Sequence, residues 1–440
     1  MKKFFALTLV LALIVVGCKK EPEPTKDSIK LNTETWTASY EGEAVNLTVT
    51  ASGDFTPKSD VDWITVSGST VTVAPNPNYE PRTGKVTFTC GEATATLTVN
   101  QDAAPKPKVY TELDGPANSY VITAAGDYKI KATVMGNGDA GLHSTFPITS
   151  TAINPAGAEL VWTEVNDLIT DIQLKDGYIC FSVPKALDGN ALVAATAADG
   201  TILWSWHIWS TEGFSTVAIP DTPWELMDRN LGALGSTAAD GEAAFGMYYQ
   251  WGRKDPFSRV IGFEGSEYSY PCTEKGAGED NTISYSIANP NVYIAHANTG
   301  DNGDWLVESN NWLWGSNTQD PGVWNDKVTS FKALFDPCPK GYRVASMWAL
   351  NTAYGPDNSY CVSVDGGITL GNGGIIFIPN SSFIYCVGHG WWDPYATVWT
   401  DQSAAWGDKD KEAFRAVPGD AHMNYARGFG QAVRCMKHAE

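Results

Sequence analysis

The chain has 440 residues and a formal net charge of −20 at pH 7, with 30 lysines and arginines against 50 aspartates and glutamates. This acidic balance argues against nucleic-acid binding, which needs a basic footprint on the protein surface. Glycine (42 residues), proline (24) and tryptophan (17) are abundant. Long helical periods are few. We therefore expect a β-rich chain with many loops and two or three domains.

Residues 1–17 have the three parts of a bacterial secretory signal peptide. Lys2 and Lys3 are basic, residues 4–16 form an apolar run, and Gly17 precedes Cys18. The run is too short for a membrane span, which needs about 20 apolar residues. The Gly17-Cys18 step resembles the lipobox of bacterial lipoproteins. This resemblance implies that Cys18 is acylated and that lipid alone anchors the protein to the membrane.

Residues 18–28 are charged, contain proline and show no hydrophobic period. Such a segment cannot bury a core, so we expect an extended tether. It resembles the charged segment that routes lipoproteins to the cell surface in the Bacteroidetes. The resemblance implies a lipid-anchored protein on the outside of the outer membrane.

Residues 29–102 contain short apolar–polar alternations separated by Gly, Pro and Asn. This patterning predicts an antiparallel β-sandwich. Asp62-Trp63-Ile64-Thr65-Val66, then Arg82-Thr83-Gly84-Lys85-Val86-Thr87-Phe88 and a closing Val99-Asn100-Gln101 resemble a BACON domain. The resemblance implies an immunoglobulin-like module that binds carbohydrate or mucin, or serves as a spacer. We interpret Trp36 and Trp63 as core residues and favour the spacer role.

A short proline-containing linker ends near residue 108, and residues 109–218 show a second series of strand patterns. We expect a second β-sandwich here. In its last strand Trp204, Trp206 and Ile208 share one face, and the opposite face is also largely apolar. A strand with two apolar faces is usually buried between layers, so we interpret this ladder as core rather than as a sugar platform. His207 has no histidine or carboxylate at ligand spacing and is interpreted as a hydrogen-bonded structural residue.

Residues 219–440 contain four sequence blocks in a fixed order. The blocks are Leu226-Met227-Asp228-Arg229-Asn230-Leu231-Gly232, Phe245-Gly246-Met247-Tyr248-Tyr249-Gln250-Trp251-Gly252-Arg253, Asp336-Pro337-Cys338-Pro339-Lys340-Gly341-Tyr342-Arg343-Val344 and Ala432-Val433-Arg434-Cys435-Met436. Together they resemble the Fibrobacter succinogenes major paralogous (FISUMP) domain family. Within them we interpret Asp228 and Arg229 as an internal salt bridge.

More loosely, Gly341-Tyr342-Arg343-Val344 with Val433-Arg434-Cys435 resembles the C-type-lectin-like fold of formylglycine-generating enzymes. This resemblance implies an α+β domain with long loops whose ends meet, and it implies that Cys338 and Cys435 lie within disulfide range. The enzyme family's acidic residues and second reactive cysteine are missing, because Ser346-Met347-Trp348-Ala349 and a single Cys435 stand in their places. We therefore carry over no oxidase activity and expect no enzyme.

The remaining chemistry motifs are weak. No C-x-x-C occurs in the sequence, so we expect neither a metal site nor a cofactor. Apart from Cys18 the chain has seven cysteines, an odd number that leaves at least one unpaired. Trp324-Asn325-Asp326 has the letters of a lectin calcium motif, but it precedes the Cys338 block and is interpreted as a turn. No nucleophile elbow, phosphate-binding loop or zinc-protease motif is present.

Two loop-like segments are the candidate ligand site. Residues 310–317 contain Trp312 and Trp314, and residues 388–395 contain Trp391, Trp392 and Asp393. Aromatic faces stack on sugar rings while amides and acids bond the hydroxyl groups. The alternative is that these tryptophans form a core. In an extended segment Trp391 and Trp392 cannot both face one core, so we expect one ring to be exposed.

We thus expect two immunoglobulin-like β-sandwiches followed by a C-type-lectin-like domain with long loops. The predicted function is non-catalytic binding or adhesion at the cell surface, with a glycan or glycoprotein as partner and no nucleic acid. A structural or accessory part of a surface appendage or complex is the alternative, and a glycan-processing enzyme comes third.

Overall fold

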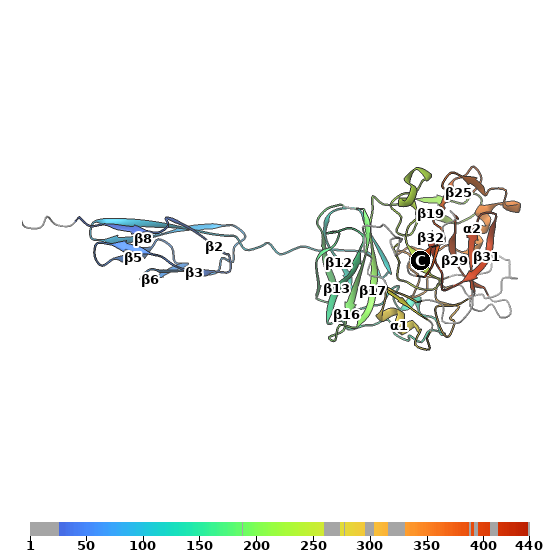
Figure 1. The fold of residues 1–440 in the computed structure, drawn as a ribbon, viewed down its shortest axis with the longest axis horizontal. Coiled ribbons are helices and arrows are strands. Elements are labelled where there is room, and N and C mark those ends of the chain that lie inside the picture. Colours follow the sequence, from blue (N-terminus) through green and yellow to red (C-terminus); the bar gives the residue numbers. More distant parts are fainter. Residues whose placement is uncertain are drawn as a thin grey trace, which may run out of the picture. The chain divides into compact units, whose positions relative to one another are not determined.

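The computed structural model describes residues 26–186, 188–258, 273–276, 278–294, 303–315, 331–386, 389–390, 395–404 and 412–438. The chain divides into two compact units, residues 1–108 and 109–440 (Figure 1). Both are built mainly from strands, and the predicted β-rich, multi-domain fold class is confirmed. No helix in the described ranges is long and apolar enough to cross a bilayer.

The N-terminal unit is a β-sandwich. One layer is the sheet β2-β9-β8-β5 and the other is β3-β7-β6, with β1 and β4 paired beside them. Inward-facing residues alternate along β8 and β9, and they bury Val86, Phe88, Leu97 and Val99 between the layers. The strands are β1 (Ile29–Leu31), β2 (Thr35–Ala38), β3 (Glu43–Asn46), β4 (Val49–Ala51), β5 (Thr56–Ser59), β6 (Ile64–Ser67), β7 (Thr70–Val73), β8 (Arg82–Cys90) and β9 (Ala93–Gln101).

Residues of the sequence motifs in this unit, Arg82, Trp63 and Gln101, form contacts that connect its two layers. The Arg82 guanidinium lies over the Trp63 ring, 4.3 Å from the ring centroid, and its Nε donates to Gln101 Oε1 at 2.8 Å. Gln101 is buried and donates in turn to Ser39 O and Ala74 O, both at 3.0 Å. Trp36 and Trp63 are partly buried against the core. Because Arg82 covers one face of Trp63, the packing interpretation fits this ring better than a sugar platform.

The first half of the C-terminal unit is a second β-sandwich. Its sheets are β10-β12-β15-β14 and β11-β17-β16-β13. Trp204, Trp206 and Trp209 on β17 are at most 1% exposed, so the aromatic ladder is core, as predicted. The elements are β10 (Thr111–Glu112), β11 (Ser119–Ile122), β12 (Gly126–Lys131), η1 (Asp139–Gly141), β13 (Gly157–Thr163), β14 (Thr170–Lys175), β15 (Tyr178–Val183), β16 (Gly189–Thr196) and β17 (Ile202–Ser210).

The second half is organised around its last strand, β32, which pairs with β19, β20, β23, β27 and β29. The ends of this half therefore meet. Helix α2 begins after Ser346, whose hydroxyl accepts from Ala349 N, and lies against β30 and β31. The elements are listed in chain order: β18 (Thr216–Ala218), β19 (Glu225–Asn230), η2 (Ala238–Ala244), β20 (Tyr248–Gln250), β21 (Thr273–Lys275), α1 (Ile283–Ala288), β22 (Val292–Ile294), β23 (Tyr342–Val344), α2 (Met347–Tyr354), η3 (Pro356–Asn358), β24 (Val362–Val364), β25 (Gly367–Leu370), β26 (Ile376–Pro379), β27 (Phe383–Cys386), β28 (His389–Gly390), β29 (Val398–Ala404), β30 (Glu412–Val417), β31 (Asp420–Ala426) and β32 (Gly430–Lys437).

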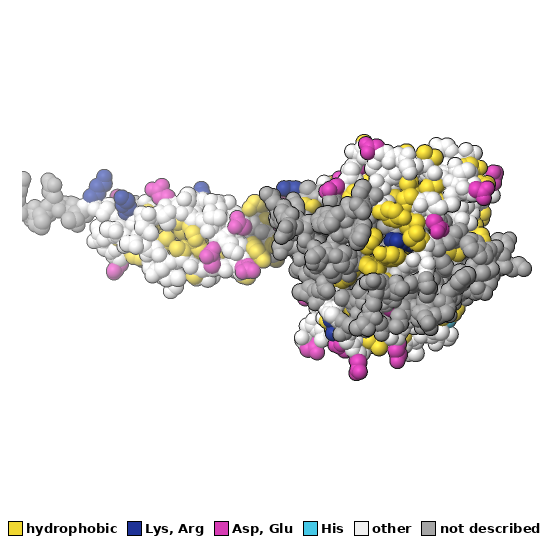
Figure 2. Space-filling model, turned by 45° about the vertical axis from the view of Figure 1, so that its right-hand side comes forward, with side chains coloured by type: hydrophobic (Ala, Val, Ile, Leu, Met, Phe, Trp, Pro, Cys, Tyr) yellow, Lys and Arg dark blue, Asp and Glu magenta, His cyan; other side chains and the backbone are white. Residues whose placement is uncertain are grey.

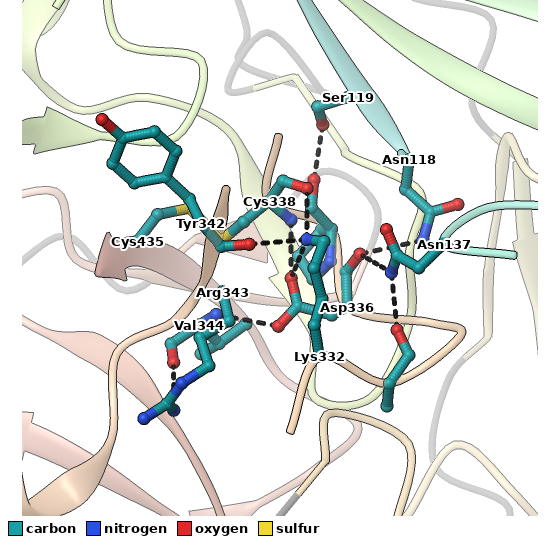
Figure 3. Close-up of polar contacts among 12 residues, drawn as sticks. Asn118, Ser119, Asn137, Lys332, Asp336, Cys338, Tyr342, Arg343, Val344 and Cys435 are labelled. Carbon is teal, nitrogen blue, oxygen red and sulfur yellow. Dashed lines mark hydrogen bonds and ion pairs between the residues drawn. A yellow bond between two sulfur atoms is a disulfide. The ribbon is translucent and has the colours of Figure 1, made fainter. Parts of the chain in front are cut away.

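The sheets on either side of the predicted domain boundary near residue 218 are separate, but the two halves share one hydrophobic core. One hydrophobic cluster runs through both halves, with Trp204 and Phe335 ring centroids 5.6 Å apart. Buried side chains reinforce it, because Asn118 Nδ2 donates to Leu334 O and Asp336 O at 2.8 Å, and Ser119 Oγ donates to Pro337 O at 2.6 Å (Figure 3). Residues 109–440 are therefore one compact unit, although the sequence suggested two domains.

The cysteine pair closes the second half. Cys338 and Cys435 form a disulfide with an S–S distance of 2.03 Å and a Cα–Cα distance of 6.0 Å, so the bond expected from the sequence is present. The Lys332 ammonium lies beside it (Figure 3) and donates to Cys338 O and Tyr342 O at 2.7 Å and to Asp336 Oδ1 at 3.2 Å. Asp336 accepts from Cys338 N and Val344 N, which fixes the strand entering β23 against β32.

Candidate functional site

The structure describes some of the predicted ligand residues but not others. Cys18, Trp391, Trp392 and Asp393 lie outside the described residues. Trp314 is fully buried, its indole Nε1 donates to Arg253 O at 3.2 Å, and its ring lies 5.6 Å from that of Trp251. The prediction that Trp314 contacts a ligand is therefore wrong, because the core of the C-terminal unit encloses the whole side chain.

Trp312 is partly buried and holds two distant segments together. Its ring stacks on the His143 imidazole with centroids 4.3 Å apart and planes at 11°. The neighbouring Asn310 donates from Nδ2 to Thr145 O at 3.3 Å. One face of Trp312 is thus covered, and the residue positions the loop that carries Asn310 rather than offering an open platform.

Beside this junction lies a groove with a volume of about 650 Å³, which is in the range of small-ligand sites. Three separate segments form its walls: residues 145–147, residues 279–284 at the start of α1, and residues 306–310. Phe146, Ile283 and Leu306 are buried and contribute apolar surface. Exposed or partly exposed polar side chains surround them, namely Thr145, Glu279, Thr282, Ser284, Glu308, Ser309 and Asn310.

A buried ion pair supports the third wall of the groove. Arg427 Nη1 lies 3.4 Å from Asp304 Oδ2, and both side chains are 1% exposed. Arg427 Nη1 also donates to Asn310 O at 3.4 Å, and the guanidinium lies 4.6 Å from the Trp251 ring centroid. Burial raises the pKa of the Asp304 carboxyl, and the charge of Arg427 opposes that rise. The segment carrying Ser309 and Asn310 is therefore held by rigid core residues.

Asn281 is the residue of the groove whose bonding is incomplete. It is fully buried, and its Nδ2 makes only a long hydrogen bond of 3.4 Å to Gly276 O. Its Oδ1 has no hydrogen-bond partner among the residues that the structure describes. A buried carbonyl oxygen without a donor costs about 1–3 kcal/mol, so this acceptor favours a ligand group that donates to it.

The charge of the groove is negative. Glu279 and Glu308 are exposed at its rim, and no lysine or arginine is among its described lining residues. Among the side chains of this unit that Figure 2 colours by type, acidic ones are seen at more places than basic ones. An anionic ligand is repelled here, whereas a neutral polyhydroxylated ligand finds acceptors, hydroxyl groups and apolar contacts together.

A second, smaller cavity of about 380 Å³ lies where α2 ends. Tyr360, Asn351, Asn372 and Asp221 line it. Its wall is tightly packed, because a Cβ atom at Gly355 would lie 2.2 Å from Tyr360 Cδ2, and Gly355 has a φ of 75°. Only glycine fits this position.

Several buried polar groups resemble catalytic residues but are closed to a substrate. Ser205 Oγ donates to Asp255 Oδ1 at 2.6 Å, and Lys254 Nζ lies 2.5 Å from both Ser205 Oγ and Asp255 Oδ1. A serine beside a lysine is an arrangement that can form a nucleophile. All three side chains are at most 3% exposed, and burial lowers the pKa of Lys254. We interpret this cluster as a structural network.

His207 is structural as well. Its Nδ1 lies 3.1 Å from Ser119 Oγ and its Nε2 2.8 Å from Asn190 Oδ1, and burial lowers its pKa to about 3. The predicted internal salt bridge is confirmed, with Arg229 Nε 3.0 Å from Asp228 Oδ1. Within the described ranges no group of three or more His, Cys, Asp or Glu side chains is placed to hold a metal ion.

Only one edge of the groove lies in a segment that the sequence predicts to bind a ligand. Asn310 was part of a predicted ligand loop, but Thr145 and Glu308 come from segments that are distant in sequence. Asn281 carries no sequence signal, because an unpaired acceptor is visible only when its neighbours in space are known.

Comparison with known proteins agrees with the description of the N-terminal unit. Residues 53–102 match the model of the BACON family, described as "Putative binding domain, N-terminal". The unit therefore contains a BACON domain, as predicted. The resemblance of the C-terminal half to FISUMP domains and lectin-like folds stays a prediction. No curated protein matches the sequence.

Among solved structures, a Bacteroides ovatus GH5 xyloglucanase in complex with a XXXG heptasaccharide is 17% identical over 20% of this chain and 22% of its own, with a TM-score of 0.17. A protein from Bacteroides thetaiotaomicron is 18% identical over 20% of this chain and 100% of its own, with a TM-score of 0.16. A chimeric titin Z1Z2 is 9% identical over 42% and 97%, with a TM-score of 0.18. At these TM-scores the likenesses carry no functional argument.

Proposed function

We propose that this protein is a cell-surface lipoprotein, anchored to the outer membrane through Cys18, that binds a neutral glycan without chemical turnover. The binding site is the groove formed by residues 145–147, 279–284 and 306–310. The observation that carries the proposal is the buried Asn281 Oδ1, which lines this groove and has no donor among the described residues.

The chemistry of the groove suits a sugar. Each sugar hydroxyl both donates and accepts, and the groove offers a free carbonyl acceptor, hydroxyl groups and carboxylates around an apolar surface. A ligand hydroxyl that donates to Asn281 Oδ1 would restore the missing hydrogen bond, which is worth about 0.5–1.5 kcal/mol net. Glu279 and Glu308 disfavour acidic sugars at this position, so neutral residues are expected here.

The N-terminal unit serves as a spacer in this proposal. Trp63 is covered by Arg82, and Trp36 is partly buried against the core of the unit. In this proposal residues 18–102 connect the lipid anchor to the C-terminal unit. The BACON domain supports a binding protein of this general kind.

The test uses the mature chain, kept soluble by Cys18→Ser, on an array of neutral and acidic glycans, followed by isothermal titration calorimetry. We expect a neutral glycan to bind and Asn281→Leu to weaken it by about tenfold, which corresponds to about 1.4 kcal/mol. Asn100→Leu, the same substitution on the N-terminal unit, should leave the affinity unchanged. Absence of neutral ligands, or equal affinity of Asn281→Leu and the parent chain, would overturn the proposal.

A further inference from the structure

Arg415 on β30 is a buried cation. Its side chain is 4% exposed, and no carboxylate pairs with it in the described part of the chain. Nη2 donates only to the thioether of Met423 at 3.4 Å, and Nε and Nη1 have no partner there. A thioether is a weak acceptor, and a guanidinium stays protonated in proteins. Two of its three nitrogens are therefore left unsatisfied.

Two other buried arginines of this unit, Arg434 and Arg427, have partners of a kind that Arg415 lacks among the described residues. Arg434 donates to Asn230 Oδ1 at 3.0 Å, to Met227 O at 2.9 Å and to Phe377 O at 2.6 Å. Arg427 has the carboxylate of Asp304. The unit thus provides partners for these structural arginines, and the missing partners of Arg415 point to a different role.

Aromatic rings surround the Arg415 guanidinium. Its Cζ lies 3.7 Å from the ring centroid of Tyr425, 5.5 Å from that of Phe383 and 5.9 Å from that of Tyr395. Cation–π contacts with these rings stabilise the charge. Leaving a buried charge without an ionic partner is strongly destabilising, and the rings offset only part of that cost.

The arrangement favours a carboxylate-bearing ligand. A guanidinium binds a planar carboxylate through two parallel hydrogen bonds, and aromatic faces beside it contact the C–H side of a sugar ring. Tyr395 and Tyr425 are partly exposed. We propose that Arg415, with Tyr395, Tyr425 and Phe383, binds the carboxylate of an acidic sugar, a uronic-acid-type or sialic-acid-type residue.

This site is separate from the groove of the proposed function and selects the opposite charge. The groove presents Glu279 and Glu308, whereas the aromatic cluster surrounds Arg415, a cation with no carboxylate partner among the described residues. In a glycan with both kinds of residue, a neutral sugar would bind in the groove and an acidic sugar at the Arg415 cluster. Because different residues form the two sites, the inference does not depend on the groove.

The test compares sodium glucuronate, N-acetylneuraminate and glucose at constant ionic strength, using the mature chain with Cys18→Ser, by thermal denaturation and calorimetry. We expect at least one of the two acids, but not glucose, to bind and to raise the melting temperature. Arg415→Met should lose this rise and weaken binding at least tenfold, while its ligand-free melting temperature stays equal or increases. Replacing an unpaired buried charge with an apolar side chain of similar size is often neutral or stabilising.

Three further variants serve as controls. Arg434→Met removes an arginine whose guanidinium is hydrogen-bonded within the core. This variant should have a lower melting temperature, as expected for the loss of a structural residue. Arg415→Lys keeps the positive charge but lacks the planar guanidinium that forms two parallel hydrogen bonds with a carboxylate. It should therefore bind the acid more weakly than the parent chain. Asn281→Leu should leave the response to the acid unchanged, which separates this site from the groove. The proposal fails if Arg415→Met is destabilised like Arg434→Met and the response to acids is retained, or if acids and glucose act alike.

Discussion

Removing the Cys338–Cys435 disulfide should strongly destabilise the C-terminal unit. The two cysteines are 97 positions apart, so the bond closes a long loop in the unfolded chain. For a loop of this length, the chain-entropy relation gives about 4.7 kcal/mol of stabilisation at 25 °C. Each kilocalorie per mole shifts the melting temperature of a domain of 150–250 residues by about 2–4 °C, and a larger unit shifts less. We therefore expect a decrease of roughly 5–15 °C in the double variant Cys338→Ala, Cys435→Ala.

The assay is differential scanning calorimetry of the oxidised parent chain, the reduced parent chain and the double variant. The N-terminal unit, which has its own core and does not contain these cysteines, provides an internal control because its transition should not move. Reduction and mutation should lower the C-terminal transition by similar amounts. A shift of less than 1–2 °C in both would refute the reasoning that this bond closes the unit.

Three other predictions concern the core, the protonation of a buried histidine and the anchor. Trp314→Ala should destabilise the C-terminal unit by about 3–5 kcal/mol in urea denaturation, because it empties a fully buried site; a loss below 1 kcal/mol would mean that the ring is not core. Burial lowers the pKa of His207 to about 3 in the folded protein, from about 6.5 in the unfolded chain. Between pH 3 and pH 6.5 the unfolded state therefore binds more protons than the folded state. Unfolding free energy should therefore fall by about 1.4 kcal/mol per pH unit as the pH decreases from 6.5 towards 3, and urea titrations at pH 7 and pH 5 should show a smaller difference in His207→Gln. Equal pH dependence in both proteins would contradict this assignment. Cys18→Ser should move the protein from washed membranes to the soluble fraction, and its retention in membranes would exclude the lipid anchor.

The sequence predicted those parts of the fold that depend on local patterns. Period-two alternation located the strands of the N-terminal sandwich and identified β17 as buried on both faces. The blocks around Cys338 and Cys435 indicated that the ends of the last module meet, and β19 does pair with β32. The strand features are visible in a sequence because each strand carries its own pattern of burial, whereas the meeting of the ends was implied by the resemblance to a lectin-like fold.

Other features depend on contacts between distant segments. Trp312 and Trp314 occur in the same short segment, yet one stacks on His143 and the other lies in the core, because an irregular loop has no period that assigns faces. The groove joins Thr145 to Asn310, which are 165 positions apart. The unsatisfied nitrogens of Arg415 were also invisible, since a sequence does not show which partners a side chain lacks.

The most direct test of the central claim is hydrogen–deuterium exchange of the mature chain with and without a neutral glycan selected on the array. Binding in the groove predicts slower exchange in peptides covering residues 279–284 and 306–310, with no change in residues 29–102. Slower exchange confined to the N-terminal unit, or unchanged exchange in both groove segments at saturating glycan, would contradict the proposal that this groove is the binding site.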